Sequence, residues 1–420
     1  MRFGMGFVYP NYKDWDRFLA LEQGASPEEV GEMEISDGQV LQDQMYLADL
    51  VEPLGFDTLW AFEQHAAPYI LIPDANQYLS YFAGRTRRID VGAMIVVLTW
   101  HNPFRVAEQI SMLQHHLSGR YYFLGVGRGL ARRNFDAMNV DIDESRERFW
   151  EIFDILQLAF TQEMFSYDGQ FYSYKNASLR PRPLDPKIVT EAWGAWTSEG
   201  TLRQCAERGM QPLTTPNKTL ESYINDMELF NQIREENGHG LARQPILQVP
   251  LYCSEDADNE QEQIHQWINE YVDSVLKMYE LGTENFAPGK SYAEYRTKGS
   301  DFGSGTYEDA LETLTTKFLR EGIIGTPEEC AEKVAAHRET VNPSEFVVLN
   351  AVGTMPKDVA EKSMRLYAEK VVPRFDDIRI RAENDPWTGR GEPQPTDGAG
   401  PRPRRKERVA ATGHVELPSI

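Results

Sequence analysis

Cysteine is scarce in this chain of 420 residues, which has only Cys205, Cys253 and Cys330. Three widely spaced cysteines provide neither a disulfide framework nor the closely spaced ligands of a metal site. No group of His, Asp or Glu residues has metal-ligand spacing either. The sequence therefore predicts three reduced, mostly buried thiols and no bound metal.

Positively charged residues are also few. The chain has 43 Lys and Arg but 65 Asp and Glu, which gives a formal charge of −22. A surface of this charge repels phosphate backbones and anionic lipid headgroups. No apolar run approaches the roughly 18 residues of a membrane-spanning helix, and the first residues lack the pattern of a secretory signal. These absences argue against nucleic acid and membranes as the main partners and predict a soluble, cytoplasmic protein.

Short β-rich runs alternate with stretches of helical spacing along almost the whole chain. The run 89–98 is nearly continuous in apolar residues, as expected of a parallel strand buried on both faces. Strands are predicted at 3–9, 58–62, 89–98, 121–127, 187–193, 211–214, 246–253 and 345–350. Helices are predicted at 38–54, 104–117, 144–162, 200–208, 220–236, 259–281, 326–338 and 356–371. About eight strand and helix pairs favour a (β/α)8 TIM barrel over an open doubly wound sheet.

Two segments depart from this alternation. Residues 282–320 are rich in Gly, Lys and Tyr, and a connection this long without firm structure is typically functional or disordered. We expect it to be a lid inserted into a barrel that spans residues 1–380. Residues 381–420 are dominated by Pro, Gly, Arg and Asp without an apolar period, which predicts a flexible tail or an arm lying on a neighbour.

Active sites of TIM barrels lie at the C-terminal ends of the strands, so polar residues that follow a strand are candidates. Gly127, Arg128 and Gly129 follow the fourth predicted strand, where bare backbone admits a flat ring or phosphate and the guanidinium pairs with phosphate oxygens. Ser198 and Thr201 begin the helix after the fifth, where hydroxyls and free amides bind anions. A tight turn or helix capping explains either pattern alone, but together they favour one phosphate held between neighbouring loops.

A second group of polar residues, Glu63, Gln64 and His65, follows the second predicted strand. His65 could exchange a proton with a bound intermediate or could simply bond to a neighbouring loop, and His101, after the third strand, is a reserve. Four aromatic residues could wall an apolar ligand pocket or cap the barrel core. These are Tyr69, Trp100, Trp193 and Trp196.

With these motifs the chain resembles the bacterial luciferase-like family of flavin-dependent monooxygenases over roughly residues 1–375. The most specific stretches, whose order and spacing match over the length of a barrel, are GFDTLW at 55–60, EQH at 63–65, SGR at 118–120, GRGL at 127–130, AERG at 206–209 and GTPEEC at 325–330. The resemblance implies a TIM barrel that takes reduced FMN (FMNH2) from a separate flavin reductase. It also implies that O2 forms a flavin hydroperoxide, which oxygenates an apolar organic substrate. We further expect a homodimer.

The resemblance also assigns roles to single positions. Arg128, Arg146, Ser198 and Thr201 match phosphate ligands, Glu63 matches a residue under the isoalloxazine, and Met94 and Ile95 match a non-prolyl cis peptide against the flavin ring. Two positions depart from the luciferases of the family. Gln64 replaces the catalytic histidine, so that either His65 or Gln64 would act, and Gly127 replaces a reactive cysteine, which we expect to enlarge the space near the flavin.

Two alternatives to this function remain open. The same barrel could use the deazaflavin coenzyme F420 for hydride transfer without oxygen. The chain could also be a non-catalytic flavin-binding subunit, for which the replaced histidine at Gln64 is the supporting feature.

Overall fold

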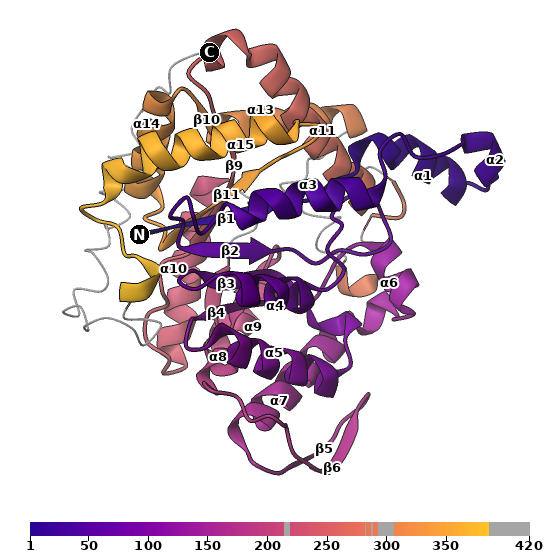
Figure 1. Cartoon of the computed structure of the whole chain (residues 1–420). Coiled ribbons are helices and arrows are strands. Elements are labelled where there is room, and N and C mark those ends of the chain that lie inside the picture. The colour runs from indigo at the N-terminus through magenta and orange to yellow at the C-terminus, as the bar shows by residue number, and fades with distance from the viewer. Residues whose placement is uncertain (214–218, 282, 287–288, 293–305, 386–420) are drawn as a thin grey trace. The chain divides into compact units, whose positions relative to one another are not determined.

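Eight parallel strands form a closed barrel in the computed structural model, which describes residues 1–213, 219–281, 283–286, 289–292 and 306–385 (Figure 1). The strands are β1 (Arg2–Phe7), β2 (Thr58–Ala61), β3 (Asp90–Val97), β4 (Tyr122–Gly127), β7 (Trp193–Ala195), β8 (Gln211–Leu213), β9 (Ile246–Cys253) and β11 (Glu345–Asn350). Each pairs with the next in this order, and β11 returns to β1. This closure confirms the predicted (β/α)8 fold. Residues 1–382 make up one compact unit.

Helices connect the strands and cover the outside of the barrel (Figure 1). They are α3 (Asp37–Asp49), α4 (Ala75–Arg85), α5 (Pro103–Leu117), α6 (Arg132–Met138), α7 (Ser145–Thr161), α8 (Lys187–Thr190), α9 (Glu199–Glu207), α10 (Leu220–Glu236), α11 (Gln261–Tyr279), α13 (Tyr307–Glu321), α14 (Pro327–Thr340) and α15 (Lys357–Leu366). Their starts follow from capping residues: Asn102 accepts from the first amides of α5, and Thr326 forms a capping box with Pro at the first position of α14. No helix in these described ranges is long and apolar enough to cross a membrane.

One predicted strand, 187–193, is wrong in its first half. Asp185 accepts a hydrogen bond from the amide of Lys187 at 2.9 Å, and Pro186 has helical backbone angles, so the chain turns into the short helix α8 before the strand. Only β7 remains as a strand there, paired with β4. The sequence patterns also did not predict α4, α6, the hairpin of β5 (Phe165–Asp168) and β6 (Ser173–Ala177), or β10 (Ile323–Gly325), which pairs with the end of β9.

Charged residues occupy the interior of the barrel next to an aromatic cluster. Nη2 of Arg2 donates to Oδ2 of Asp90 at 2.8 Å, and its Nε lies 3.2 Å from Oε2 of Glu345. Nε1 of Trp60 donates to Oε1 of Glu345 at 2.8 Å. Burial raises the pKa of Glu345 to about 7, although the positive charge of Arg2 opposes this. Glu345 is therefore a buried carboxyl group that titrates near neutrality.

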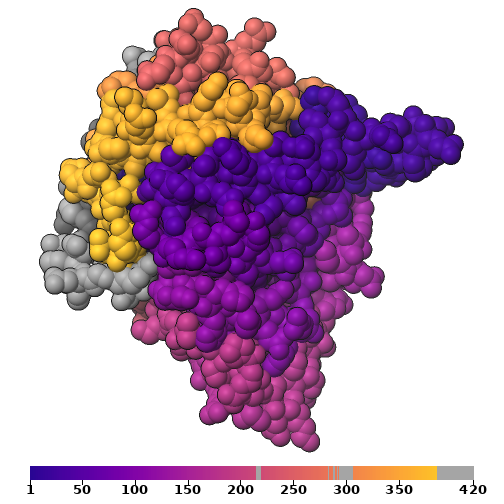
Figure 2. Space-filling view, in the orientation of Figure 1, coloured from indigo at the N-terminus to yellow at the C-terminus, as the bar shows by residue number. Residues whose placement is uncertain are grey.

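An N-terminal arm, defined as residues 12–36, contains α1 (Trp15–Glu22) and α2 (Pro27–Val30) and stands out from the molecule beside α3 (Figures 1 and 2). A cluster of ion pairs attaches its base to the barrel. Arg133 of α6 donates to both carboxylate oxygens of Glu22 at 2.7 Å. Arg132 pairs with Glu280, which follows α11, at 2.8 Å, and Arg133 lies 3.5 Å from the same carboxylate. The cluster joins the arm to α6 and to the end of α11.

Only parts of the two irregular segments lie within the described residues. Of the predicted lid, 282–320, the structure describes a turn of helix at Lys290–Tyr292 and the helix α13. Residues 282, 287–288 and 293–305 lie outside the described residues, as do 386–420 of the predicted tail. The lid and the tail stay predictions.

Candidate functional site

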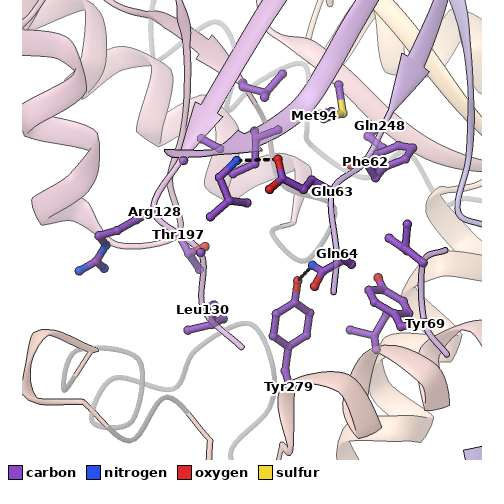
Figure 3. A pocket seen from close by; sticks show the side chains of 18 of the residues that line it. Phe62, Glu63, Gln64, Tyr69, Met94, Arg128, Leu130, Thr197, Gln248 and Tyr279 are labelled. Carbon is purple, nitrogen blue, oxygen red and sulfur yellow. Dashed lines mark hydrogen bonds between the residues drawn. The ribbon is translucent and has the colours of Figure 1, made fainter. Parts of the chain in front are cut away.

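A cavity of about 220 Å³ opens where the barrel strands end at their C-terminal side. We call it the main cavity. Its walls are mostly apolar, and its polar groups come from the segments after β2, β4 and β7 and from the barrel interior. Figure 3 shows Arg128 and Thr197 on one side of it and Gln64, Tyr69 and Tyr279 on the other. This position matches the usual active-site face of a TIM barrel.

The Arg128 side of the main cavity carries the groups expected to bind a phosphate. Arg128, Thr197 and Thr201 line it. Ser198 caps α9 by accepting from the amide of Thr201 at 3.4 Å, so it lies at the edge of this group, although it is not among the lining residues. Arg146 of α7 is not in the lining either, and its Nη1 donates to Gln204 at 3.3 Å. The structure thus brings together Arg128 and the start of α9 in one lining, whereas Arg146 contacts Gln204 of α9 outside it.

Arg128 is buried and fixed by an aromatic neighbour. Its guanidinium lies 4.1 Å from the ring centre of Tyr292, a cation–π contact. The hydroxyl of Tyr292 donates to the carbonyl oxygen of Gly129 at 2.7 Å. The described part of the predicted lid therefore contacts the loop that carries Arg128.

Met94, Ile95 and Gly127 also line the main cavity, and the peptide bond between Met94 and Ile95 is cis. A Cβ at Gly127 would lie 2.1 Å from Cδ1 of Ile95. The space beside Gly127 is thus filled by the Ile95 side chain. The expectation that this glycine enlarges the cavity is wrong, because its neighbour occupies the volume that a larger residue would take.

Glu63 is a buried carboxylate with three hydrogen-bond donors. Oε1 accepts from Nε2 of His101 at 2.8 Å and from Nε2 of His65 at 3.2 Å, and Oε2 accepts from the amide of Val97 at 3.1 Å. Burial acts to raise the pKa of Glu63, but the hydrogen bonds from the two histidines outweigh it and hold the pKa below its usual value. Burial acts to lower the pKa of His101, but its bond to Glu63 outweighs this and raises the pKa. The contact between Glu63 and His101 therefore favours the charged form of both groups.

The side chains of Gln64 and His65 have different surroundings. Gln64 lines the main cavity, where its Nε2 donates to the hydroxyl of Tyr279 at 3.0 Å and its Oε1 accepts from Asn134 at 2.6 Å. His65 is absent from the lining of the main cavity and packs edge-on against Trp100, with ring centres 5.1 Å apart. His65 contacts two residues of the main cavity's lining, Trp100 through its ring and Glu63 through a hydrogen bond.

A second cavity of about 590 Å³ lies between the N-terminal arm and the loop after β2. Gln64 and Ile70 line both cavities, while His65 lines only the second. The charged residues of this second cavity are Asp14, Arg17 and Asp37. The loop that carries Gln64 and His65 is therefore a thin wall between two cavities.

The model of the luciferase-like monooxygenases matches residues 22–342, three quarters of the chain. The chain belongs to the luciferase-like monooxygenase family. It is thus an oxidoreductase of the monooxygenase class. This luciferase-like chain is 24% identical over 350 residues to the alkanal monooxygenase alpha chain of Photobacterium leiognathi, an alignment that covers 81% of this chain and 95% of the relative.

Solved structures share the barrel of this luciferase-like monooxygenase. Monooxygenase RslO1 of Streptomyces bottropensis has a TM-score of 0.68 at 21% identity, covering 89% of this chain and 100% of that one. The oxygenating constituent of 3,6-diketocamphane monooxygenase of Pseudomonas putida, in complex with FMN, has a TM-score of 0.62 at 16% identity, with 89% and 99% covered. The coenzyme F420 dependent tetrahydromethanopterin reductase of Methanopyrus kandleri reaches 0.57 at 17%, also with 89% and 99% covered.

Several residues of the candidate site are not predicted from the sequence. Asn134 and Tyr279, the partners of Gln64, come from α6 and from the end of α11. His101 is only the second candidate for proton exchange in the sequence, and its position after the third predicted strand is the feature that indicates it. Of the four candidate aromatic residues, Tyr69, Trp100 and Trp196 line the main cavity, whereas Trp193 packs inside the barrel.

Proposed function

We propose that this chain is an FMNH2-dependent monooxygenase that receives reduced FMN from a separate flavin reductase and inserts one oxygen atom of O2 into an apolar organic substrate. The proposal rests on one observation, which is that the main cavity has a polar side and an apolar side. Arg128, Thr197 and Thr201 line one side of it, and apolar walls with the single carboxylate Glu63 form the rest. A phosphate and a large apolar ring system need these two environments next to each other.

The residues present fit reduced FMN. The guanidinium of Arg128 and the start of α9 are suited to its phosphate, since cationic and hydroxyl donors there complement a dianion. Gly129, next to Arg128, has a φ of +80°, and a Cβ there would lie 2.8 Å from the ring of Trp100. The backbone can approach a ligand closely at such a position. When bound, FMN supplies the electrons that activate O2.

The chain's own residues then have distinct tasks in the proposal. Met94, Ile95 and Gly127 would lie against the ring, and the apolar walls would keep water away from it. Gln64 can donate or accept a hydrogen bond in the main cavity, but it carries no titratable proton. Proton exchange in the main cavity would therefore involve Glu63, because it is the histidine-bonded carboxylate of the lining.

The test supplies NADH, FMN, a generic flavin reductase and a panel of linear aldehydes and cyclic ketones to the full chain. We expect at least one compound to gain the mass of one oxygen atom, with O2 consumed in proportion, and we expect omission of the chain to abolish the product. A chain that binds FMN but converts no compound and leaves O2 consumption at the level of the reductase alone would contradict the proposal. It would support the non-catalytic subunit instead.

A deazaflavin-dependent oxidoreductase is the second candidate, favoured by the shared barrel of the Methanopyrus kandleri enzyme. Hydride transfer to a deazaflavin needs no oxygen. Reduction of F420 by an alcohol under anaerobic conditions, together with no oxygenated product from FMNH2, would select this candidate. The expected homodimer is a separate question. Size-exclusion chromatography with light scattering, which measures the molar mass of the protein in solution, would test it.

A further inference from the structure

Glu63 and His65 belong to different cavities but are hydrogen-bonded to each other. Glu63 lines the main cavity, His65 lines the second, and Nε2 of His65 is 3.2 Å from Oε1 of Glu63. The residue between them, Gln64, also lies in this wall, but its amide cannot take up a proton near neutrality. Within the described part of the chain, Nδ1 of His65 has no hydrogen-bond partner. The Glu63–His65 contact is therefore a hydrogen-bonded link between the two cavities.

We propose that Glu63 and His65 carry protons through this wall, from water in the second cavity to the reacting group in the main cavity, with His101 as the charged partner of Glu63. This inference rests on the proposed function for the group that takes up the proton. His65 touches no reacting atom in this scheme and acts as a relay residue.

The two cavities differ in a way that makes such a relay useful. The main cavity is walled mostly by apolar side chains, and oxygen chemistry on a reduced flavin requires that bulk water be kept out. The second cavity, of about 590 Å³, is open to solvent and large enough to hold water. A relay through the wall delivers protons without admitting this water.

Each transfer can be written with its proton balance. Nδ1 of His65 takes a proton from a hydronium ion in the second cavity, which leaves water and gives an imidazolium. The Nε2–H bond then breaks and its electron pair stays on Nε2, while a new O–H bond forms at Oε1 of Glu63 across the 3.2 Å contact. Glu63 passes this proton to the acceptor in the main cavity and returns to a carboxylate. This leaves His65 protonated on Nδ1. The ring then turns so that Nε2 meets the second cavity, where Nδ1 gives its proton to water and Nε2 takes one up, and the turn back restores the Nε2–H form.

Both positively and negatively charged groups surround the Glu63–His65 contact. On the side of the second cavity, Asp14 is paired with Arg17 at 3.3 Å, and Asp37 accepts from Asn11 at 2.8 Å. Asp74 adds a negative charge near His101.

On the side of the main cavity, Arg128 is the cation of the lining. His101 is the remaining charged neighbour, at 2.8 Å from Glu63, and it offsets the carboxylate between transfers.

Chemical rescue tests the relay in the full chain supplied with reductase, FMN and an accepted substrate. His65→Ala should lower the rate of product formation by roughly 10², and added imidazole should restore about tenfold or more by taking the place of the lost ring. His116→Ala is the matched control, because His116 is exposed on α5 and lines neither cavity. It should leave the rate unchanged with or without imidazole. A folded, FMN-binding His65→Ala variant that keeps the full rate, or that imidazole does not restore, would overturn the relay.

A second variant checks the route of the imidazole. Ala67 lines only the second cavity. Adding Ala67→Phe to His65→Ala should fill part of that cavity and abolish the rescue. Rescue that persists unchanged in the double variant would contradict entry from the second cavity.

A measurement on the flavin-free chain separates this inference from the proposed function. In a 15N-histidine-labelled sample, the Nε2 signals of His65 and His101 should both show a hydrogen bond to a carboxylate, since both donate to Oε1 of Glu63. In Glu63→Gln both signals should shift. If the His65 signals of Glu63→Gln overlay those of the wild type at every pH, the link does not exist. A wild type that yields no oxygenated product and leaves O2 consumption at the level of the reductase alone would instead refute the proposed function, while the His65 signals would still decide the link.

Discussion

Glu345 is the buried carboxyl group that we expect to make the stability of the barrel depend on pH. Its side chain is enclosed by Trp60 and Arg2 inside the barrel, and its pKa rises from 4.5 to about 7 because burial disfavours the charged form. The perturbation is Glu345→Gln, which keeps an oxygen for the Trp60 indole and removes the titration.

The magnitude follows from the pKa change. A tenfold change in proton affinity corresponds to about 1.4 kcal/mol, so ionising Glu345 in the folded chain costs about 3 kcal/mol more than in the unfolded chain. The folded chain binds this proton more tightly, so the stabilisation is fully present below pH 4.5 and is lost as the pH rises through about 7. Between pH 5 and pH 8 the wild type should lose about 2.5 kcal/mol relative to Glu345→Gln.

Urea unfolding followed by circular dichroism at half-unit steps from pH 5 to pH 8 measures this difference. Glu32→Gln is the control, because Glu32 is exposed on the N-terminal arm, and it should leave the pH dependence of the unfolding free energy as in the wild type. If wild type and Glu345→Gln differ by a constant amount across this range, Glu345 does not titrate there and the reasoning fails. A change in the slope with urea would show instead that the variant alters the surface exposed on unfolding.

Three further predictions concern the main cavity and the barrel wall. Arg128→Ala should weaken FMN binding by roughly tenfold to a hundredfold with an unchanged circular dichroism spectrum, because a charge-assisted hydrogen bond contributes about 1.5 to 3 kcal/mol; equal affinity by fluorescence titration would remove Arg128 from the phosphate site. Gly92→Ala should lower the unfolding free energy by about 1 to 3 kcal/mol, since the new Cβ would lie 2.4 Å from the ring of Trp60, and thermal unfolding at wild-type temperature would contradict this packing. Gln64→Leu should break the bond to Tyr279 and raise the share of O2 released as H2O2, measured with peroxidase; an unchanged share would show that Gln64 does not order the cavity.

The sequence predicts those elements best whose apolar pattern is long and regular. The predicted ranges 220–236, 246–253 and 345–350 coincide with α10, β9 and β11, because each has a clear period and a capping or turn signal at its ends. Strand β10 has three residues, too few to show any period. The helix α8 contains Ile188, Val189 and Thr190, whose branched side chains favour a strand, and only the Asp185 cap decides for a helix.

The sequence predicts those residues of the candidate site that directly follow a barrel strand. Arg128 and Thr201 follow neighbouring strands, so their meeting at one cavity follows from the barrel topology. The partners of Gln64 were not predictable, because Tyr279 is 215 residues away in the sequence. Nor does a run of three polar residues show which of them faces which cavity.

The ion pairs at the base of the N-terminal arm lie one residue away from the groups that hold Gln64. Asn134 directly follows Arg133, and Tyr279 directly precedes Glu280, the carboxylate that Arg132 and Arg133 share. The position of a neutral amide inside the main cavity is thus coupled to salt bridges near the outer surface. Loss of these pairs should therefore loosen both groups that hold the Gln64 side chain, although none of the paired residues lines the cavity.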